Sequence, residues 1–206
     1  MHHPSFAEYS DALQLDLGRS LSDALLRRGT LRMRGPAHPV AHTGNFALTF
    51  EVVVDGKRHA VRCFHKPSDS LHEPYAAIAT CQRSIRSPYL VDFEFQTSGI
   101  TTESGTYPIV QMEWAEGPTL AAFVSDHRHD VNALQSLRAS LRALAAHLQA
   151  HGIAHGDIQP TNLLVRGPTD LRLIDYDGMY VQQLAGRYST ELGHRNLQHP
   201  GRRPCH

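Results

Sequence analysis

The stretch Ile153-Ala-His-Gly-Asp-Ile-Gln-Pro-Thr-Asn-Leu-Leu-Val165 decides the fold, together with Leu171-Arg-Leu-Ile-Asp-Tyr-Asp-Gly178. Asp157 precedes Asn162 by five residues in the spacing H-x-D-x-x-x-x-N, and Asp175 opens an Asp-aromatic-x-Gly turn after a short apolar segment. The first motif lies between a predicted helix and a predicted strand, and the second Asp follows that strand. We therefore expect three oxygen-bearing side chains to meet at one place.

These three side chains suit phosphoryl transfer. The reaction needs a carboxylate that orients the attacking hydroxyl and a magnesium ion that neutralises charge on the phosphates. Asp157 is the candidate for the first task. Mg²⁺ prefers oxygen ligands, and Asn162 with Asp175 would supply the protein's share. The alternative is a structural role, because Asp and Asn in loops often form turns or helix caps.

The motifs resemble the catalytic core of the protein-kinase-like superfamily, which includes eukaryotic-type protein kinases and the aminoglycoside and choline phosphotransferases. The chain is most similar to bacterial serine/threonine kinase-like proteins, from about Gly44 to its end. The segments that carry the resemblance are His155-Gly-Asp157, Ala60-Val-Arg-Cys-Phe64, Met112-Glu-Trp114 and Glu191-Leu-Gly-His-Arg195.

The resemblance implies an α+β fold of the protein-kinase-like two-lobe type, with a small antiparallel sheet and one helix in the N-lobe and an incomplete helical C-lobe. It implies a helical extension and linker at residues 1–40 and an N-lobe at 41–115. The hinge and a partial C-lobe, with the catalytic loop and the metal-binding Asp turn, would occupy 116–206. Few residues follow Gly178, so we expect a C-terminally truncated kinase in which part of the apolar face of helix 134–148 is exposed or covered by another chain.

The resemblance also places the nucleotide phosphates. Gly44, Asn45 and Phe46 stand at the position of the glycine-rich loop, although only one of the usual three glycines is present. Ala60 and Arg62 are two apart on a predicted strand and so face the same side. In the family the alanine lies against the adenine, and a lysine at the Arg62 position contacts the phosphates. Arginine keeps the charge but is not interchangeable with lysine.

Further nucleotide contacts are implied at the helix and at the hinge. Glu73 is the nearest carboxylate that could pair with Arg62, and Gln82 is the second choice. Met112 would stand at the back of the adenine pocket. The backbones of Glu113 and Ala115 would hydrogen-bond the purine edge.

Gln159 departs from the family because protein kinases usually have a lysine two residues after the catalytic Asp, and a neutral amide cannot supply its charge. Asp177 replaces a glycine and could hold metal or cap the turn. The implied cofactors are ATP and Mg²⁺, and the expected reaction is transfer of the γ-phosphoryl group to a serine or threonine hydroxyl of a protein. A nucleotide-binding pseudokinase or scaffold without catalysis, which the Arg62 and Gln159 departures favour, and a kinase of small-molecule hydroxyls are the alternatives.

Periodicity predicts the remaining elements. Alternating apolar residues and the turn Asp55-Gly56 predict a hairpin that joins Phe46–Val54 to Arg58–Phe64. Helices are expected at 22–28 with a stop at Gly29, from Pro74 through Arg86, and from Ala133 to His151, where leucines recur on one face. Strands near Leu90–Gln96 and Ile109–Glu113 would be joined by the Gly- and Thr-rich segment 98–106.

The composition bounds the partners and the compartment. The chain has 206 residues, 20 basic and 20 acidic, and a pI near 7.3, which gives no electrostatic reason to expect nucleic acid or a membrane surface as partner. ATP and a protein substrate or partner chain are the expected partners. Three widely spaced cysteines, Cys63, Cys81 and Cys205, predict no disulfide framework and favour a reducing cytoplasm.

Overall fold

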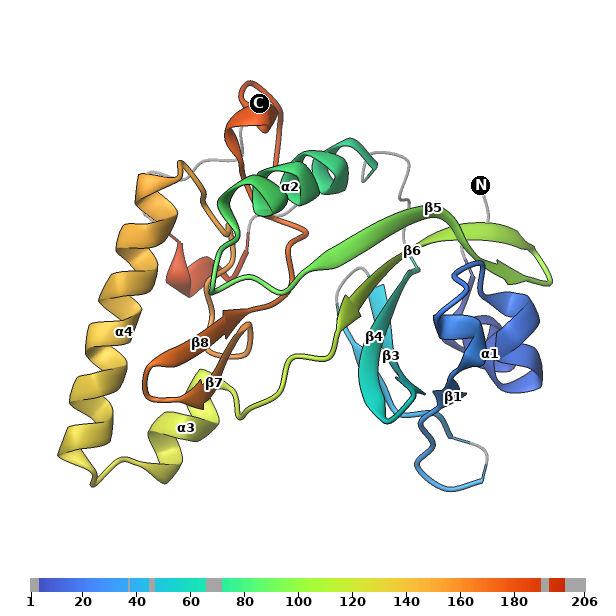
Figure 1. The fold of residues 1–206 in the computed structure, drawn as a ribbon, viewed down its shortest axis with the longest axis horizontal. Coiled ribbons are helices and arrows are strands. Elements are labelled where there is room, and N and C mark those ends of the chain that lie inside the picture. Colours follow the sequence, from blue (N-terminus) through green and yellow to red (C-terminus); the bar gives the residue numbers. More distant parts are fainter. Residues whose placement is uncertain (1–3, 37, 45–46, 66–71, 190–192, 199–206) are drawn as a thin grey trace. The chain divides into compact units, whose positions relative to one another are not determined.

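The computed structural model describes residues 4–36, 38–44, 47–65, 72–189 and 193–198. The chain is α+β and forms two compact units (Figure 1). The first unit comprises Met1–His72 and Asp92–Trp114, and the second comprises Glu73–Val91 and Ala115–His206.

The first unit is built on one antiparallel sheet. Its strands run in the order β1-β3-β4-β6-β5, and β2 also pairs with β3. The bounds are β1 Thr30–Leu31, β2 Ala41–Thr43, β3 Ala47–Val54, β4 Lys57–Phe64, β5 Phe93–Thr102 and β6 Gly105–Glu113.

The β3–β4 hairpin confirms the prediction made from Asp55-Gly56. Both residues have positive φ, 49° and 78°, which matches the turn to the right-handed twist of the strands. Val54 pairs directly with Lys57 across this two-residue turn. Phe46, the first residue of the predicted hairpin, lies outside the described residues.

One face of this sheet carries the core of the first unit. Because side chains alternate along a strand, β3 directs its even-numbered apolar residues toward helix α1, Phe6–Ser20. This helix begins at Ser5, whose hydroxyl accepts a bond from Glu8 N. The buried Tyr9 hydroxyl donates to Phe64 O at 2.7 Å, and its burial raises the pKa of the phenol. Where the sequence predicted a helix over 22–28, the structure has only a 3₁₀ turn, Leu26–Arg28, that ends at Gly29.

The β5–β6 hairpin corrects the prediction of a loop over 98–106. Both strands continue through that segment and turn at Glu103 and Ser104. Glycine and threonine suggested a loop, but the threonines are β-branched and suit a strand. The pairing shifts register between Gln96 and Ile100, at an irregularity that contains Gly99, where a Cβ would overlap the Ile109 side chain.

The second unit contains helices α2 His72–Ile85 (from Glu73 on), α3 Leu120–Asp126 and α4 Val131–Ala150, and the hairpin of β7 Leu163–Gly167 and β8 Asp170–Leu173. The predicted helices 74–86 and 133–151 correspond to α2 and α4. Residues 73–91 group with the second unit, whereas the sequence prediction put them with 41–115. The chain after α2 pairs with β8, where Leu173 N donates to Tyr89 O at 2.8 Å.

Helix α4 begins at Asp130, whose carboxylate accepts a bond from Ala133 N at 3.0 Å. Leu137, Leu144 and Leu148 of the predicted leucine face are buried. Leu134 and Leu141, on the same predicted face, are half-buried. Within the described part of the chain, α4 and the other helices are too short or too polar to cross a bilayer.

Candidate functional site

The candidate site is the loop 153–162 between α4 and β7, in the second unit. Helix α4 ends before Gly152, whose φ of 64° lets the chain reverse direction. Ala154 and Tyr180 then form an antiparallel bridge, with N–O distances of 3.1 and 2.7 Å in the two directions. The loop is thereby fixed to the segment that follows β8.

Asp157 is the centre of this loop and is 9% exposed. Its Oδ2 accepts hydrogen bonds from Gln159 Nε2 at 2.8 Å and from Asn162 Nδ2 at 3.0 Å. Its Oδ1 accepts one from the backbone N–H of His194 at 2.7 Å. Donors on both oxygens orient the carboxylate.

The turn that begins at Asp175 lies beside this loop. Ile174 N donates to Asn162 O, and His155 Nε2 donates to Ile174 O, both at 3.0 Å. The residue before Asp175 is thus bonded to both ends of the motif that contains Asp157. The sequence prediction that the two turns meet agrees with these bonds.

Asp175 itself has an unusual backbone conformation. Its φ is 69°, in the left-handed region that only a few per cent of non-glycine residues adopt. Such a conformation costs free energy and occurs preferentially at functional sites. The side chain is half-buried and lies two residues after the end of β8.

Two glycines let the turns approach each other. Gly156 has a φ of 84°, and a Cβ there would overlap the carbonyl oxygen of Gly178. Gly193 has a φ of 70°, and a Cβ there would come too close to Gly156 O and to the Asp157 carboxylate. The backbone contact of the turns therefore requires glycine at 156 and at 193.

His155 is 1% exposed, and its ring lies between the carbonyl of Ile174 and the backbone N–H of Asp157. Burial lowers the pKa of its imidazole, although the bond to Ile174 O and the carboxylates of Asp175 and Asp157 act in the other direction. Nε2 carries the proton given to Ile174 O, so Nδ1 is the acceptor that faces Asp157 N–H at 3.4 Å. The ring acts as a neutral support of the loop.

Helix α2 is joined to the Asp175 turn through Tyr75. The buried Tyr75 hydroxyl donates to Asp177 Oδ1. Asp177, for which the sequence left metal binding or turn capping open, therefore accepts a bond from the helix. Tyr176 fixes the turn from its other side, because its hydroxyl donates to Leu173 O at 2.8 Å and accepts from Val91 N at 2.7 Å.

The residues of this network to which the sequence prediction gave no role at the site include Tyr75, Tyr176, Gly193, His194 and Gln198. The Gln198 amide donates to Gly156 O at 3.0 Å, and thus holds the segment that contains His194 against the loop. The glycine at position 193 was the sequence signal that could have pointed to this segment, because glycine often marks a close approach of two backbones.

Three predicted nucleotide residues lie in the sheet of the first unit, on the face opposite its core. Ala60 pairs with Glu51 on one side and with Met112 on the other. Arg62 lies two residues along β4 and pairs with Thr49 and Val110. The three therefore share a face, which the sequence had predicted for Ala60 and Arg62. Ala60 and Arg62 are 6% and 9% exposed.

The remaining residues that the sequence placed at the nucleotide lie before β3, in α2 and at or after the end of β6. Gly44 donates its N–H to Ala47 O at 2.9 Å and does not have positive φ, while Asn45 and Phe46 lie outside the described residues. Glu73 in the first turn of α2 forms an ion pair with Arg187. Glu113 is the exposed last residue of β6, and Ala115 follows at the start of the next stretch of the second unit.

Metal ligands were predicted at Asn162 and Asp175. Among the described residues, no group of three or more His, Cys, Asp or Glu could hold a metal ion, but a magnesium site made from one carboxylate, one amide oxygen and substrate phosphates is of a different kind. The Asn162 Nδ2 points at Asp157, so its amide oxygen, to which no described residue donates, is the end that remains for a cation. The donor set is all oxygen and fits Mg²⁺.

Neither a protein-family model nor a curated protein matches the chain. Any functional conclusion therefore depends on the geometry of the residues themselves.

Proposed function

We propose that the chain is an ATP-dependent phosphotransferase of the kinase-like type, which transfers the γ-phosphoryl group of Mg-ATP to a serine or threonine hydroxyl of a protein. The observation that carries this function is the pair of bonds at Ile174. They join the Asp157–Asn162 loop to the Asp175 turn. A loop that bears an oriented carboxylate and an amide oxygen, next to a turn that bears a second carboxylate, matches the needs of phosphoryl transfer.

Each residue has a distinct role in this reaction. Asp157 accepts the proton of the attacking hydroxyl at a carboxylate oxygen that Gln159 and Asn162 orient. Asn162 and Asp175 would hold Mg²⁺, which supplies charge neutralisation at the phosphates when it is bound. Ala60, Met112 and the cation Arg62 on the first unit's sheet are the candidates for nucleotide binding.

A nucleotide-binding protein without catalysis is the second candidate, and one observation favours it. The Asp157 Oδ1 already accepts the His194 N–H at 2.7 Å, and Oδ2 accepts two side-chain amides. Three of the roughly four lone-pair sites of the carboxylate are thereby occupied, which leaves little capacity for a substrate hydroxyl. Gln159 also lacks the charge that a lysine would supply there.

Two measurements separate these possibilities. Mg-ATP should raise the melting temperature of the native chain by mass action, because only the folded state binds it. Asp175→Asn should remove the magnesium-dependent part of that shift, and the exposed Asp126→Asn should retain it. The absence of any magnesium-dependent shift in the native chain would contradict nucleotide binding.

Catalysis is tested by transfer of radiolabelled γ-phosphate from ATP to the chain itself and to a serine-rich acceptor protein. Asp157→Asn should keep the Mg-ATP melting shift and lose transfer by a factor of about 10² or more. Binding without transfer in the native chain would select the second candidate. Transfer that survives in Asp157→Asn would exclude the role given to Asp157.

A further inference from the structure

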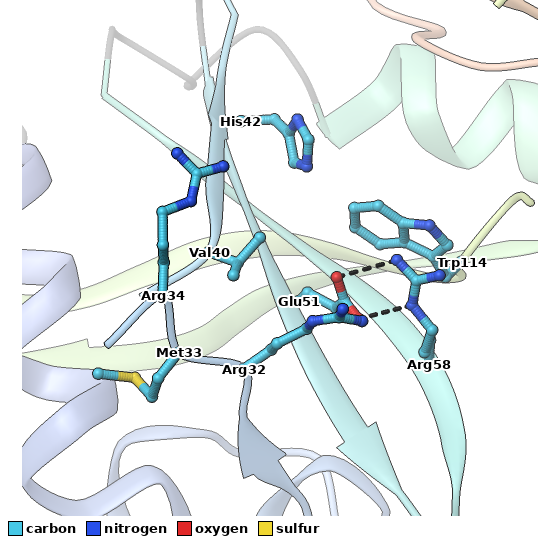
Figure 2. A pocket seen from close by; sticks show the side chains of 8 residues that line it. All are labelled: Arg32, Met33, Arg34, Val40, His42, Glu51, Arg58 and Trp114. Carbon is cyan, nitrogen blue, oxygen red and sulfur yellow. Dashed lines mark hydrogen bonds and ion pairs between the residues drawn. The ribbon is translucent and has the colours of Figure 1, made fainter. Parts of the chain in front are cut away.

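A hollow of about 380 Å³ lies within the first unit, on the same sheet face as Ala60 (Figure 2). Its polar lining includes Arg32, Arg34, His42, Glu51, Arg58 and Trp114. The volume falls in the range of small-molecule sites.

The arginines are placed by strand geometry. The segments on either side of Gly35 form a hairpin in which Met33 bridges to Pro39 and Arg34 N donates to His38 O at 2.6 Å. Arg32 N donates to Glu51 O at 2.8 Å, so this hairpin continues from the sheet. Arg32 and Arg34 both line the hollow; the Arg32 guanidinium lies beside Glu51, and the Arg34 side chain extends away from that carboxylate (Figure 2).

A buried carboxylate organises two of the guanidinium groups. Glu51 is 1% exposed. It accepts Arg58 Nε at 2.5 Å and Arg58 Nη2 at 3.0 Å, and Arg32 Nη1 at 2.8 Å (Figure 2). Burial opposes ionisation of Glu51, but the bonds from Arg58 and Arg32 outweigh it and hold the pKa below its ordinary value. The Cζ of Arg58 also lies 4.7 Å from the centre of the Trp114 ring. This contact restricts rotation of the Arg58 guanidinium.

Positive charge is in excess among the residues that line the hollow. The lining holds three guanidinium groups and one carboxylate. Arg34 forms no ion pair with a described residue, and its guanidinium is drawn above Val40 and to the left of His42 in Figure 2. Guanidinium forks match the oxygens of phosphate two at a time.

We propose that this hollow binds a small phosphate-bearing molecule, with Arg34 and Arg32 as its oxyanion ligands. A phosphomonoester carries close to two negative charges at neutral pH and would balance the excess. His42 and Trp114, whose ring centres are 5.4 Å apart and whose planes are inclined at 48°, provide an aromatic wall for the organic part of such a ligand. Arg58 and Arg62 are four residues apart on β4, or roughly 13 Å, so this anion site is distinct from the position predicted for the ATP phosphates.

Calorimetric titration with inorganic pyrophosphate tests this site, in EDTA so that no magnesium-dependent nucleotide site contributes. The native chain should bind saturably, and Arg34→Gln should weaken the affinity about tenfold or more, because a hydrogen bond between charged groups is lost. Arg34→Lys keeps the positive charge but lacks the guanidinium fork, so its affinity should lie between those of the native chain and Arg34→Gln. Arg19→Gln removes a cation whose side chain is 90% exposed and should bind like the native chain.

Three results would overturn the site: no saturation by millimolar pyrophosphate, equal affinity in the native chain and in Arg34→Gln, or the same loss in Arg19→Gln. Citrate supplies carboxylates in place of phosphates, and tighter binding of citrate than of pyrophosphate would exclude phosphate as the recognised group. Because neither Asp175 nor magnesium takes part, this result is independent of the Mg-ATP measurements.

Discussion

The side-chain amide of Asn162 donates to both the backbone carbonyl and the carboxylate of Asp157, at 3.1 and 3.0 Å. These two bonds from one nitrogen link the two ends of the segment 157–162, and both residues are buried. The Asn162 backbone carbonyl meanwhile accepts the N–H of Ile174. One residue thus sets the shape of the loop and its distance from the Asp175 turn.

Asn162→Ala should therefore destabilise the protein. The substitution removes both bonds and leaves two buried acceptors on Asp157 with fewer donors, which costs about 2 kcal/mol. Equilibrium unfolding in urea measures this. Asn132→Ala, at an exposed position of α4, should change the free energy of unfolding by less than about 0.5 kcal/mol. Equal stabilities of the two variants would show that the Asn162 bonds contribute nothing.

The contact between Gly156 and Gly178 predicts a steric effect. In Gly156→Ala the new Cβ would overlap the Gly178 carbonyl oxygen, and the backbone also has positive φ. We expect a loss of at least about 2 kcal/mol in unfolding free energy. Gly152→Ala is the matched control, because Gly152 also has positive φ but no atom of a described residue within 4 Å of the added Cβ. That variant should lose only about 1 kcal/mol, and a reversed order would contradict the close approach.

Much of this local structure could be predicted because it depends on short-range patterns. Asp55-Gly56 supplies the positive φ of the β3–β4 turn, and the leucine spacing predicts α4. The spacing of Asp157 and Asn162 likewise places them in one loop, where they share a hydrogen bond.

The long-range bonds could not be predicted because their donors have no distinctive side-chain signal. Asp157 accepts the backbone N–H of His194, 37 residues away, and nearly every residue has such a group. Glu73 forms an ion pair with Arg187 in the second unit. The sequence did not indicate this contact, because it does not show which cations an acid contacts.

Tyr75→Phe tests the link between α2 and the Asp175 turn, whose partners are 102 residues apart. Loss of the hydroxyl removes a buried bond to a carboxylate and should lower the free energy of unfolding by about 2 kcal/mol. Tyr188→Phe removes a hydroxyl from a residue that is 65% exposed and should cost less than about 0.5 kcal/mol. Urea denaturation of both variants gives the comparison. A Tyr75→Phe protein as stable as Tyr188→Phe would mean that the bond to Asp177 does not stabilise the turn.

His155 predicts a pH dependence of stability. Its pKa is lowered in the folded state, chiefly by burial, from an ordinary value of 6.5. Below that pH the unfolded chain binds a proton that the folded chain excludes, so the contribution of His155 is complete above pH 6.5 and is lost as the pH falls toward the folded-state value. The slope approaches about 1.4 kcal/mol per pH unit.

Urea unfolding at pH 7.5, 6.5 and 5.5 measures this contribution. The chain has 15 histidines, so the relevant quantity is the difference between the native protein and His155→Gln. Between pH 7.5 and 5.5 the native protein should lose about 1 kcal/mol more than the variant, because an imidazolium would place a proton on Nδ1 against the N–H of Asp157. His129→Gln, at an exposed position, should follow the native curve. Parallel curves for the native protein and His155→Gln would show that the buried ring is not the group that titrates.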